Sequence, residues 1–401
     1  MSSHQKWKWM QEELKQLEQK SQLRSLHETT ILENGWILRD GKKMLNLASN
    51  DYLGLSERFN KTNVTELIEE EEPISSSLRF GSTASRLIVG NDPIYREFET
   101  QFASFKGTED CLVFSSGYMA NVGVISSIIG RKDVVFSDRL NHASIIDGII
   151  LSRAENKRYR HRDVEHLEYL LKKVDLNQKK LIVTDSIFSM DGSVAPLKQL
   201  VELKNKYGAM LMVDEAHSGG IYGMKGQGLV HALGLTDEVD ILMGTFSKAY
   251  GCYGAYIAGD SILIQYLMNK ARSFIFTTAL PPINIAAIKQ NWCRVKSENW
   301  RQKLLLEKSA WFKQQLQSRG FNIGESESQI IPLIVGDNKK TMEFSTLLQE
   351  KGVAAVAIRP PTVPEDTARI RFTIMSSHQD EDLKKVIEYI DEVGECLKVK
   401  K

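Results

Sequence analysis

The sequence predicts an α/β protein whose large domain is built on a mostly parallel β-sheet. Short apolar runs, typical of buried strands, recur along the chain at residues 111–114, 133–136, 181–184, 209–213, 239–243 and 254–258. Amphipathic helical segments, for instance 163–173 and 196–207, fill much of the space between them. Short buried strands joined by helices indicate a parallel sheet with helices on both faces, and such sheets bind ligands at the carboxyl ends of their strands.

Residues 1–50 are predicted to form a helix followed by a small β-meander. Apolar residues recur at three- and four-residue steps within 5–25, which indicates an amphipathic helix with one apolar stripe: Trp7, Met10, Leu14 and Leu17. Such a stripe packs either on a partner subunit or on its own domain, and the sequence leaves both open. Asn34-Gly35 and Asp40-Gly41 stand beside apolar runs, where these dipeptides predict tight turns.

A helix is predicted to follow Asp92, because Asp92 suits its N-cap, Pro93 its first turn and Gly107 its end. Farther on, a helical segment over 261–272 precedes the Pro281-Pro282 break. Long helices are expected after that break.

A second α/β region is predicted near the end of the chain, with strands at 329–335, 354–357 and 368–373. We therefore expect three parts: an N-terminal helix and meander over 1–50, a large domain over 51–285 and a smaller C-terminal α/β domain over 286–401. An acidic run over 66–73 is interpreted as a solvated surface.

Composition excludes several classes of partner. Acidic and basic residues nearly balance, 51 against 52, which argues against a nucleic-acid ligand. The four cysteines are scattered without CxxC spacing, as expected of a reduced interior. No run approaches the roughly 20 apolar residues of a membrane helix, and the N-terminal residues do not resemble a signal peptide. The sequence thus predicts a cytoplasmic protein with no membrane partner.

The candidate chemistry lies at the ends of two predicted strands. Lys248 follows the strand at 239–243, and Asp214 follows the strand at 209–213. A lysine withheld from bulk water is a nucleophilic amine that can form a Schiff base with an aldehyde. A lone lysine in a Ser/Gly turn is ordinarily a surface residue, but the aspartate on a second strand favours a functional interpretation. Pyridoxal phosphate needs this pair, a lysine for its aldehyde and a carboxylate for its ring nitrogen.

A phosphate group would bind where a strand turns into a helix through small residues, because free backbone N–H groups and the helix dipole favour an anion there. The segment 115–121, which begins with Ser115-Ser116-Gly117-Tyr118 and ends at Asn121, is the best candidate, although an ordinary turn has the same pattern. Thr277 and Thr278 form a second possible phosphate contact.

Three further residues could contact a pyridine ring. His142 follows a predicted strand and could stack on the ring, or be a structural histidine. His217 lies three residues after Asp214, from where it could reach the phenolic oxygen of the ring. Ser189 is a small donor in the loop after the strand at 181–184.

Two competing motifs are rejected on spacing. Asp214-Glu215-Ala216-His217 spells a helicase DEAH box, but the only Gly-Lys pair, Gly41-Lys42, lacks the upstream glycine of a phosphate loop. The glycines of 223–228 do not have dinucleotide-binding spacing. No Cys/His cluster accompanies Asp214 and His217, so no metal site is predicted.

With these residues, the sequence resembles the α-oxoamine synthases, pyridoxal-phosphate enzymes of aminotransferase fold type I. The resemblance runs from about residue 20 to the end and is carried by four motifs, at 49–55, 188–192, 213–217 and 244–248. It implies a mostly parallel seven-stranded sheet, a smaller C-terminal α/β domain and a homodimer with shared active sites.

The resemblance also implies a role for each candidate residue. Lys248 would hold the cofactor as a Schiff base, Asp214 would pair with its ring nitrogen, His217 would lie near its phenolic oxygen and His142 against its face. Further contacts to the cofactor are expected from Gly117, Tyr118, Ser189, Thr245, Thr277 and Thr278, the last two from the other subunit of a dimer. Arg371 would bind the amino-acid carboxylate, and the acyl substrate would contact Arg24, Asn50 and Thr362. Asp185 stands where many relatives have glutamate, so its role is left open.

The segment 358–364 resembles the family branch that condenses L-alanine with a pimeloyl thioester in biotin biosynthesis, releasing CO2. The sequence does not decide whether the acyl group arrives on CoA or on a carrier protein. The alternative within the family joins glycine to acetyl-CoA. A non-catalytic subunit on the same fold is a third possibility, against which Lys248, Asp214 and both histidines argue.

Overall fold

The computed structural model describes residues 6–56, 79–175 and 177–400. The chain divides into two compact units. Unit 1 comprises Met1–Asn50, Met190–Gly192 and Leu305–Lys401; unit 2 comprises Asp51–Ser189 and Ser193–Leu304. The acidic run predicted at 66–73 lies outside the described residues. The sequence-based division into domains 1–50, 51–285 and 286–401 concerns parts that fold independently, and it stays a prediction.

Unit 2 is built on a seven-stranded sheet of order β4-β10-β9-β8-β7-β5-β6. Its strands are β4 (Asp110–Phe114), β5 (Val134–Asp138), β6 (Glu155–Tyr159), β7 (Lys180–Asp185), β8 (Met210–Asp214), β9 (Ile241–Thr245) and β10 (Ala255–Gly259). Strand β10 is antiparallel to both its neighbours, and the other pairings are parallel. The mostly parallel seven-stranded sheet is thereby confirmed.

Strand β6 is the one strand of this sheet that the apolar runs do not predict. Its sequence is Glu-Asn-Lys-Arg-Tyr, and only Tyr159 is buried. Because β6 is an edge strand paired with β5 alone, it has no need of the continuous apolar sequence that marks the central strands.

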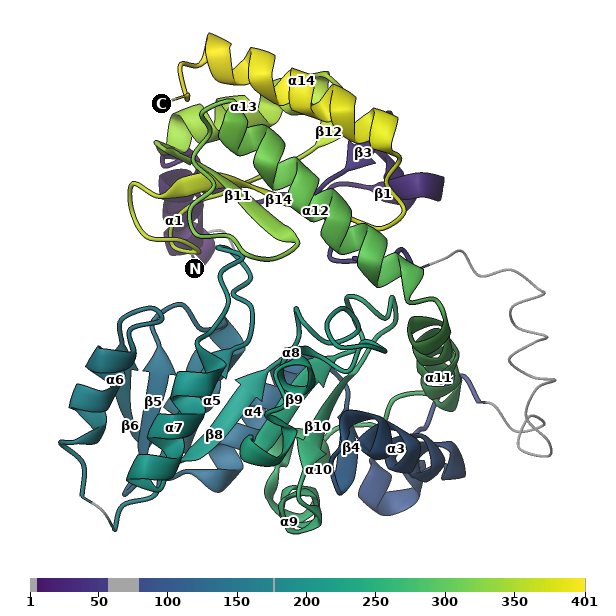
Figure 1. Ribbon diagram of the computed structural model, residues 1–401, viewed down its shortest axis with the longest axis vertical. Helices are drawn as coiled ribbons and strands as arrows, with labels where there is room; N and C mark the ends of the chain where they lie inside the picture. Colours follow the sequence, from purple (N-terminus) through teal and green to yellow (C-terminus); the bar gives the residue numbers. More distant parts are fainter. Residues whose placement is uncertain (1–5, 57–78, 176, 401) are drawn as a thin grey trace. The chain divides into compact units, whose positions relative to one another are not determined.

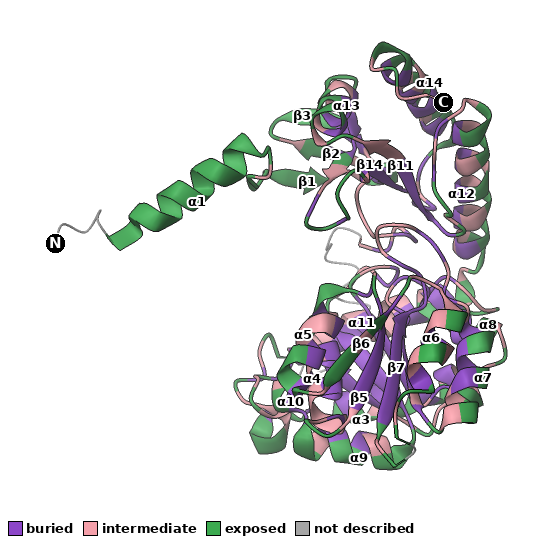
Figure 2. Ribbon diagram, turned by 90° about the vertical axis from the view of Figure 1, so that its left-hand side faces the viewer, coloured by how far each residue is buried: buried purple, intermediate pink, exposed green. Residues whose placement is uncertain are grey.

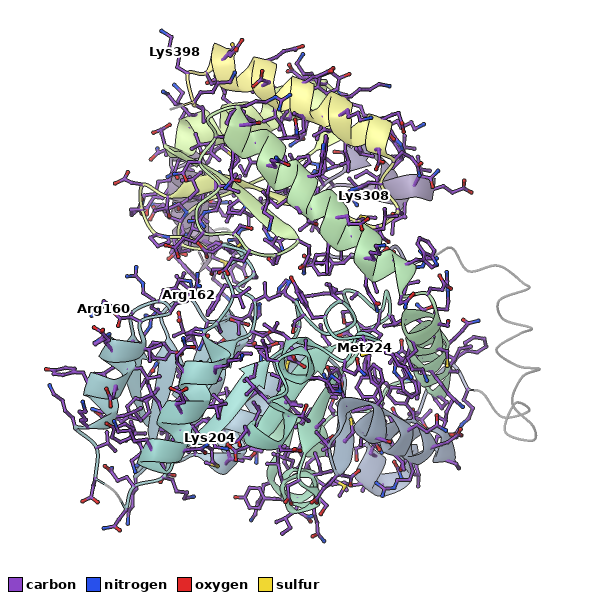
Figure 3. The ribbon with its side chains drawn as sticks, viewed as in Figure 1. Arg160, Arg162, Lys204, Met224, Lys308 and Lys398 are labelled. Atoms are coloured by element: carbon purple, nitrogen blue, oxygen red, sulfur yellow. The ribbon has the colours of Figure 1, made fainter. Side chains whose placement is uncertain are left out.

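Helices lie on both faces of the sheet (Figure 1). The helical elements of unit 2 are η4 (Arg86–Gly90), α3 (Pro93–Lys106), α4 (Gly117–Ile128), α5 (Ala143–Ser152), α6 (Val164–Leu171), α7 (Leu197–Tyr207), α8 (Leu229–Ala232), η5 (Thr236–Glu238), α9 (Ser261–Lys270), α10 (Arg272–Ile275) and α11 (Pro282–Ser297). The strands supply a continuous apolar core, shown for β5 and β7 as buried ribbon in Figure 2. Lys204 of α7, labelled in Figure 3, donates to Asp240 at 3.1 Å and thereby joins the helix to the segment before β9.

Helix α3 begins and ends as its sequence predicts. The Asp92 carboxylate accepts from the Ile94 N–H at 3.2 Å, and Pro93 is the first helical residue. Gly107 ends the helix in the left-handed region at φ 76°, a conformation that other residues adopt only with strain.

Unit 1 contains two small sheets, of order β1-β2-β3-β12 and β11-β14-β13. Their strands are β1 (Thr29–Ile31), β2 (Trp36–Arg39), β3 (Lys42–Asn46), β11 (Ile330–Gly336), β12 (Val353–Ala354), β13 (Val356–Ile358) and β14 (Ala368–Thr373). Its helical elements are α1 (Lys8–Gln19), η2 (Glu33–Gly35), α13 (Asn338–Glu350) and α14 (Asp380–Cys396), together with most of α12 (Trp300–Ser318).

The predicted meander is present, with Asn34 and Gly35 at positive φ between β1 and β2 and Asp40 and Gly41 between β2 and β3. The single strand predicted at 354–357 is instead two strands in different sheets, since β12 pairs with β3 and β13 with β14.

Helix α1 confirms the predicted N-terminal helix, and none of its residues is buried (Figure 2). Within the described part of the chain, no helix has the length and apolar character needed to cross a membrane.

Candidate functional site

Unit 2 places Asp214 and Lys248, the two central residues of the predicted cofactor site, at the carboxyl ends of neighbouring strands. Asp214 is the last residue of β8, and Lys248 lies three residues beyond the end of the neighbouring strand β9. Parallel strands direct their carboxyl ends to one edge of the sheet, which is where such sheets bind ligands.

Asp214 is buried, with 3% of its surface exposed, and its two oxygens have different partners. Oδ1 accepts from the Ala216 N–H at 2.8 Å, and Oδ2 accepts from Asn121 Nδ2 at 2.8 Å. Among the described residues, no lysine, arginine or histidine forms an ion pair with it. A buried carboxylate is costly without a positive partner, so the site suits a cationic ring nitrogen.

His142 caps helix α5 and is linked to Asp214 by hydrogen bonds. His142 Nδ1 lies 2.8 Å from Ser144 Oγ, which accepts from Asn121 Nδ2 at 2.9 Å. Burial lowers the pKa of His142 below its usual value, and the Asp214 carboxylate opposes that shift. A neutral imidazole at this position is suited to stacking on an aromatic ring.

Asp185 ends strand β7 and pairs in register with Asp214 of β8. Its Oδ2 accepts the backbone N–H of His142 at 2.9 Å. Burial, and then the nearby Asp214 charge, raise the pKa of Asp185 well above its usual value. The carboxyl group whose role the sequence left open therefore supports the backbone that carries His142.

Lys248 is half-buried and lies beside His217. The Lys248 Nζ and His217 Nε2 atoms are 2.8 Å apart, and His217 Nδ1 lies 2.6 Å from the Tyr52 hydroxyl. The structure therefore brings together the lysine and the histidine that the sequence predicted separately.

The predicted phosphate site is the N-terminus of α4. Ser116 caps this helix by accepting from the Met119 N–H at 3.3 Å. A Cβ added to Gly117 would lie 3.0 Å from Met243 Cε and 3.8 Å from Thr245 Cβ, so Gly117 and Thr245 are neighbours. Tyr118 is half-exposed, and its hydroxyl donates to Asp147.

Three further predicted cofactor contacts lie in loops of unit 2. Ser189 lies in the loop after β7. Thr277 and Thr278 follow α10, and Thr277 Oγ1 donates to the neighbouring Thr278 carbonyl at 3.5 Å. Their roles stay predictions.

The predicted substrate residues all belong to unit 1. Arg371 of β14 donates to Asn50 Oδ1 at 2.9 Å. Arg24 and Thr362 line a cavity of about 810 Å³ together with Arg359. Burial, and then the Arg24 charge, lower the pKa of Arg359. No aspartate or glutamate is among the described residues that line this cavity, so its polar part attracts anions.

A model of the aminotransferase class I and II family matches residues 42–390. The chain belongs to this family. A Bacillus cereus protein described as "Putative 8-amino-7-oxononanoate synthase" is 52% identical over 390 residues, 96% of each chain, and a Bacillus anthracis protein of the same description is also 52% identical over 96% of each chain.

Solved structures agree with this assignment. A serine palmitoyltransferase from S. paucimobilis, with pyridoxal phosphate and myriocin bound, has a TM-score of 0.90 at 27% identity and covers 100% of both chains. An 8-amino-7-oxononanoate synthase from Francisella tularensis has a TM-score of 0.75 at 27% identity, covering 88% of this chain and 98% of that one. Within the aminotransferase family the chain is an α-oxoamine synthase, a pyridoxal-phosphate-dependent acyltransferase, as its motifs predicted.

The site of this α-oxoamine synthase fits its cofactor. The buried Asp214 carboxylate offers a negative partner for the ring nitrogen, and Lys248 offers an amine for the aldehyde. Gly117 leaves room at the start of α4, where a side chain would approach Met243. Among the described residues, no group of three or more histidine, cysteine, aspartate and glutamate side chains could hold a metal ion.

Sequence reasoning missed three residues of the α-oxoamine synthase site: Tyr52, Asn121 and Ser144. Tyr52 lies inside the motif at 49–55, Asn121 ends the predicted phosphate segment at 115–121, and Ser144 follows His142 by two residues. Tyr52 and Asn121 each bond a residue distant along the chain, His217 and Asp214, and Asn121 also bonds Ser144, so no local pattern predicts these three contacts.

Proposed function

We propose that this enzyme condenses L-alanine with a pimeloyl thioester, forming 8-amino-7-oxononanoate with release of the thiol and CO2, as in biotin biosynthesis. The observation that carries the proposal is the 52% identity, over 96% of each chain, to relatives described as synthases of that product. The segment 358–364, which resembles this branch of the family, supports it.

Pyridoxal phosphate, when bound, would supply an acceptor for the electron pair left when a bond to the amino-acid Cα breaks. Asp214 would hold the protonated ring nitrogen, and His142 would orient the ring. The Lys248 amine would take the Cα proton and later return a proton to the product. Arg371 would bind the amino-acid carboxylate, a task suited to a planar guanidinium.

The acyl substrate would contact Arg24, Asn50 and Thr362. A pimeloyl group ends in a free carboxylate, and its thiol carrier bears phosphate. The absence of acidic residues among the described lining of the cavity around Arg24 and Arg359 supports binding of one of these anions.

A panel of substrates tests the proposal. Thiol release is measured with L-alanine, glycine or L-serine, each combined with pimeloyl-, acetyl- or palmitoyl-CoA, and with pimeloyl carrier protein. We expect L-alanine with a pimeloyl donor to give the highest kcat/KM. A preference for glycine with acetyl-CoA would instead assign the enzyme as a 2-amino-3-oxobutyrate CoA ligase.

We further propose a homodimer in which Thr277 and Thr278 reach the partner's cofactor. Exposed apolar residues support it: Phe276 is 71% exposed, and α10 beside it contacts η4, where Ile88 is 75% exposed. Apolar surface of this kind commonly marks an interface between subunits.

Mixed dimers test the shared site. A Lys248→Ala subunit supplies intact threonines, and a Thr277→Ala/Thr278→Ala subunit supplies an intact lysine. We expect activity to return when the two inactive variants are mixed and allowed to exchange subunits. A monomer in sedimentation equilibrium, or no recovery on mixing, would contradict the shared site.

A further inference from the structure

Tyr52, His217 and Lys248 form a hydrogen-bonded line across three segments of unit 2. The Tyr52 hydroxyl lies 2.6 Å from His217 Nδ1, and His217 Nε2 lies 2.8 Å from Lys248 Nζ. Tyr52 is fully buried and His217 is 4% exposed. The two ring nitrogens of His217 therefore have different partners: Nδ1 faces the Tyr52 hydroxyl, and Nε2 faces the Lys248 amine, which is proposed to bear the cofactor.

The segment that carries Tyr52 is fixed against the turn that follows Lys248. Gly251 has φ 61°, and a Cβ there would lie 2.5 Å from backbone atoms of Leu55 and Ser56. Asn291 Nδ2 donates to the carbonyls of Leu55 at 3.1 Å and Tyr250 at 2.8 Å, which joins the two segments. The Tyr52 hydroxyl is thus held at a defined position relative to the lysine.

The hydroxyl matters because it can both donate and accept, whereas an ammonium can only donate. When Lys248 is an ammonium, His217 Nε2 must accept, so Nδ1 carries the ring proton and donates to Tyr52. When Nε2 must donate, to a deprotonated amine or to an oxygen of the cofactor, the proton moves to Nε2 and the Tyr52 hydroxyl donates to Nδ1. The tyrosine accommodates both tautomers without leaving a buried polar atom unpaired.

We propose that Tyr52 is the positioning residue of His217: it holds the imidazole toward Lys248 and lets the histidine exchange tautomers as the lysine changes its protonation state. The proposal rests on the proposed function only in taking Lys248 as the residue that bears the cofactor. Other titratable groups that act on this part of the site are His142 and Asp185, both affected by the Lys248 charge, and Asp214.

Tyr52→Phe tests the proposal in the holoenzyme. We expect the visible absorption of the lysine-bound cofactor to titrate with an apparent pKa shifted by about 0.5–1 pH unit, since one hydrogen bond to His217 is lost. The kcat should fall about 10–100-fold with little change in KM, as expected for loss of a supporting residue. Tyr95→Phe is the matched control, because Tyr95 is also buried but its hydroxyl donates to the Leu280 carbonyl at 2.7 Å.

A double-mutant cycle shows whether Tyr52 acts through the histidine. In a His217→Asn background, Tyr52→Phe should leave the titration of the cofactor unchanged. A wild-type titration in Tyr52→Phe, or a full shift that persists without His217, would overturn the proposal. The titration needs no substrate, so its result tests the role of Tyr52 whatever substrates the panel identifies.

The tautomer of His217 can also be measured directly in the wild-type protein, which tests the proposal even if Tyr52→Phe does not fold. In the apoenzyme labelled with 15N-histidine, the His217 signals are assigned by their loss in His217→Asn. At neutral pH we expect the tautomer protonated on Nδ1. Protonation on Nε2 alone would contradict the inferred arrangement.

Discussion

Lys106 Nζ lies 2.6 Å from Glu215 Oε2, and both side chains are almost wholly buried. Glu215 follows Asp214 directly, and its other oxygen accepts the Val230 N–H at 2.8 Å. Lys106 also donates to the Gln227 carbonyl. This ion pair therefore fixes the segment between β8 and α8, which carries His217, against helix α3.

Glu215→Gln should lower the free energy of unfolding by about 3–5 kcal/mol. Glutamine preserves the size of the side chain and can still accept from Val230, but it leaves the Lys106 ammonium buried without a negative partner. Urea unfolding of wild type and variant measures the loss. The double variant Lys106→Met/Glu215→Gln, which also removes the unpaired ammonium, should recover part of the lost free energy of unfolding. A loss below about 1 kcal/mol in the single variant Glu215→Gln would show that Lys106 finds another partner.

The fold could be predicted largely from apolar runs, because the central strands of a doubly covered sheet are buried on both faces. Strands β7 and β8 are examples, since nearly every residue in them is buried. Edge strand β6 lacks that constraint, and β12 is too short to carry a pattern of its own. Where a strand pairs outside its immediate neighbourhood, as β12 does with β3, tertiary contacts rather than local sequence decide the sheet it joins.

Lys248→Ala should abolish the visible absorption of the lysine-bound cofactor and reduce turnover by at least about 10²–10⁴-fold, because it removes the residue proposed both to hold the cofactor covalently and to act as general base. Absorption spectra after incubation with pyridoxal phosphate, followed by a turnover assay, measure the two effects. Lys225→Ala, at an exposed lysine, is the control and should behave as wild type. Covalent incorporation at the wild-type level in Lys248→Ala would exclude this lysine as the site of attachment.

Asp185→Asn should make stability less dependent on pH. The pKa of Asp185 is raised in the folded protein, mainly by burial, so the folded state binds a proton that the unfolded state releases. Its contribution to stability therefore falls as pH rises from the usual carboxyl pKa toward the raised value. Asparagine can still accept from the His142 N–H, and it carries no charge at any pH.

Thermal unfolding of the apoenzyme between about pH 4 and about pH 8 measures this difference. The melting temperature of Asp185→Asn should rise relative to wild type as pH increases. Asp163→Asn is a useful contrast, because hydrogen bonds lower the pKa of that partly exposed helix-cap carboxyl. The Asp163→Asn variant should instead lose stability relative to wild type as pH rises. If the difference in melting temperature between Asp185→Asn and wild type were the same at every pH, the Asp185 carboxyl would be ionised throughout this range.

The candidate site residues that lie at or just beyond the ends of strands could be predicted from sequence. The residues that link them through hydrogen bonds could not. Lys248 and Asp214 each follow an apolar run, and their pairing has a chemical reason. Asn121 joins Asp214 to Ser144 through side-chain hydrogen bonds between segments far apart in the chain. Such contacts depend on the packing of α4 and α5 over the sheet, which local patterns do not specify.

His378 in unit 1 is a fully buried histidine whose two ring nitrogens both have backbone partners. Nε2 donates to the Asn46 carbonyl at 3.1 Å, and Nδ1 accepts the Met375 N–H at 3.2 Å. Lys308, labelled in Figure 3, donates to the His378 carbonyl and to the Ser376 carbonyl, which adds positive charge nearby. Burial lowers the pKa of His378 to about 4, while the bond to Asn46 opposes the shift.

This pairing predicts a loss of stability in mild acid. The unfolded chain binds a proton at His378 near its ordinary pKa of about 6.5, whereas the folded protein does so only near 4, so stability present above 6.5 is lost as pH falls through that interval. The loss between about pH 7 and about pH 4.5 should be about 2–3 kcal/mol by urea unfolding. His378→Gln, which retains a donor and an acceptor without titrating, should remove most of that dependence, whereas His27→Gln at an exposed position should leave it intact. An equal acid-induced loss in His378→Gln and wild type would mean that other groups, and not this imidazole, determine the acid sensitivity.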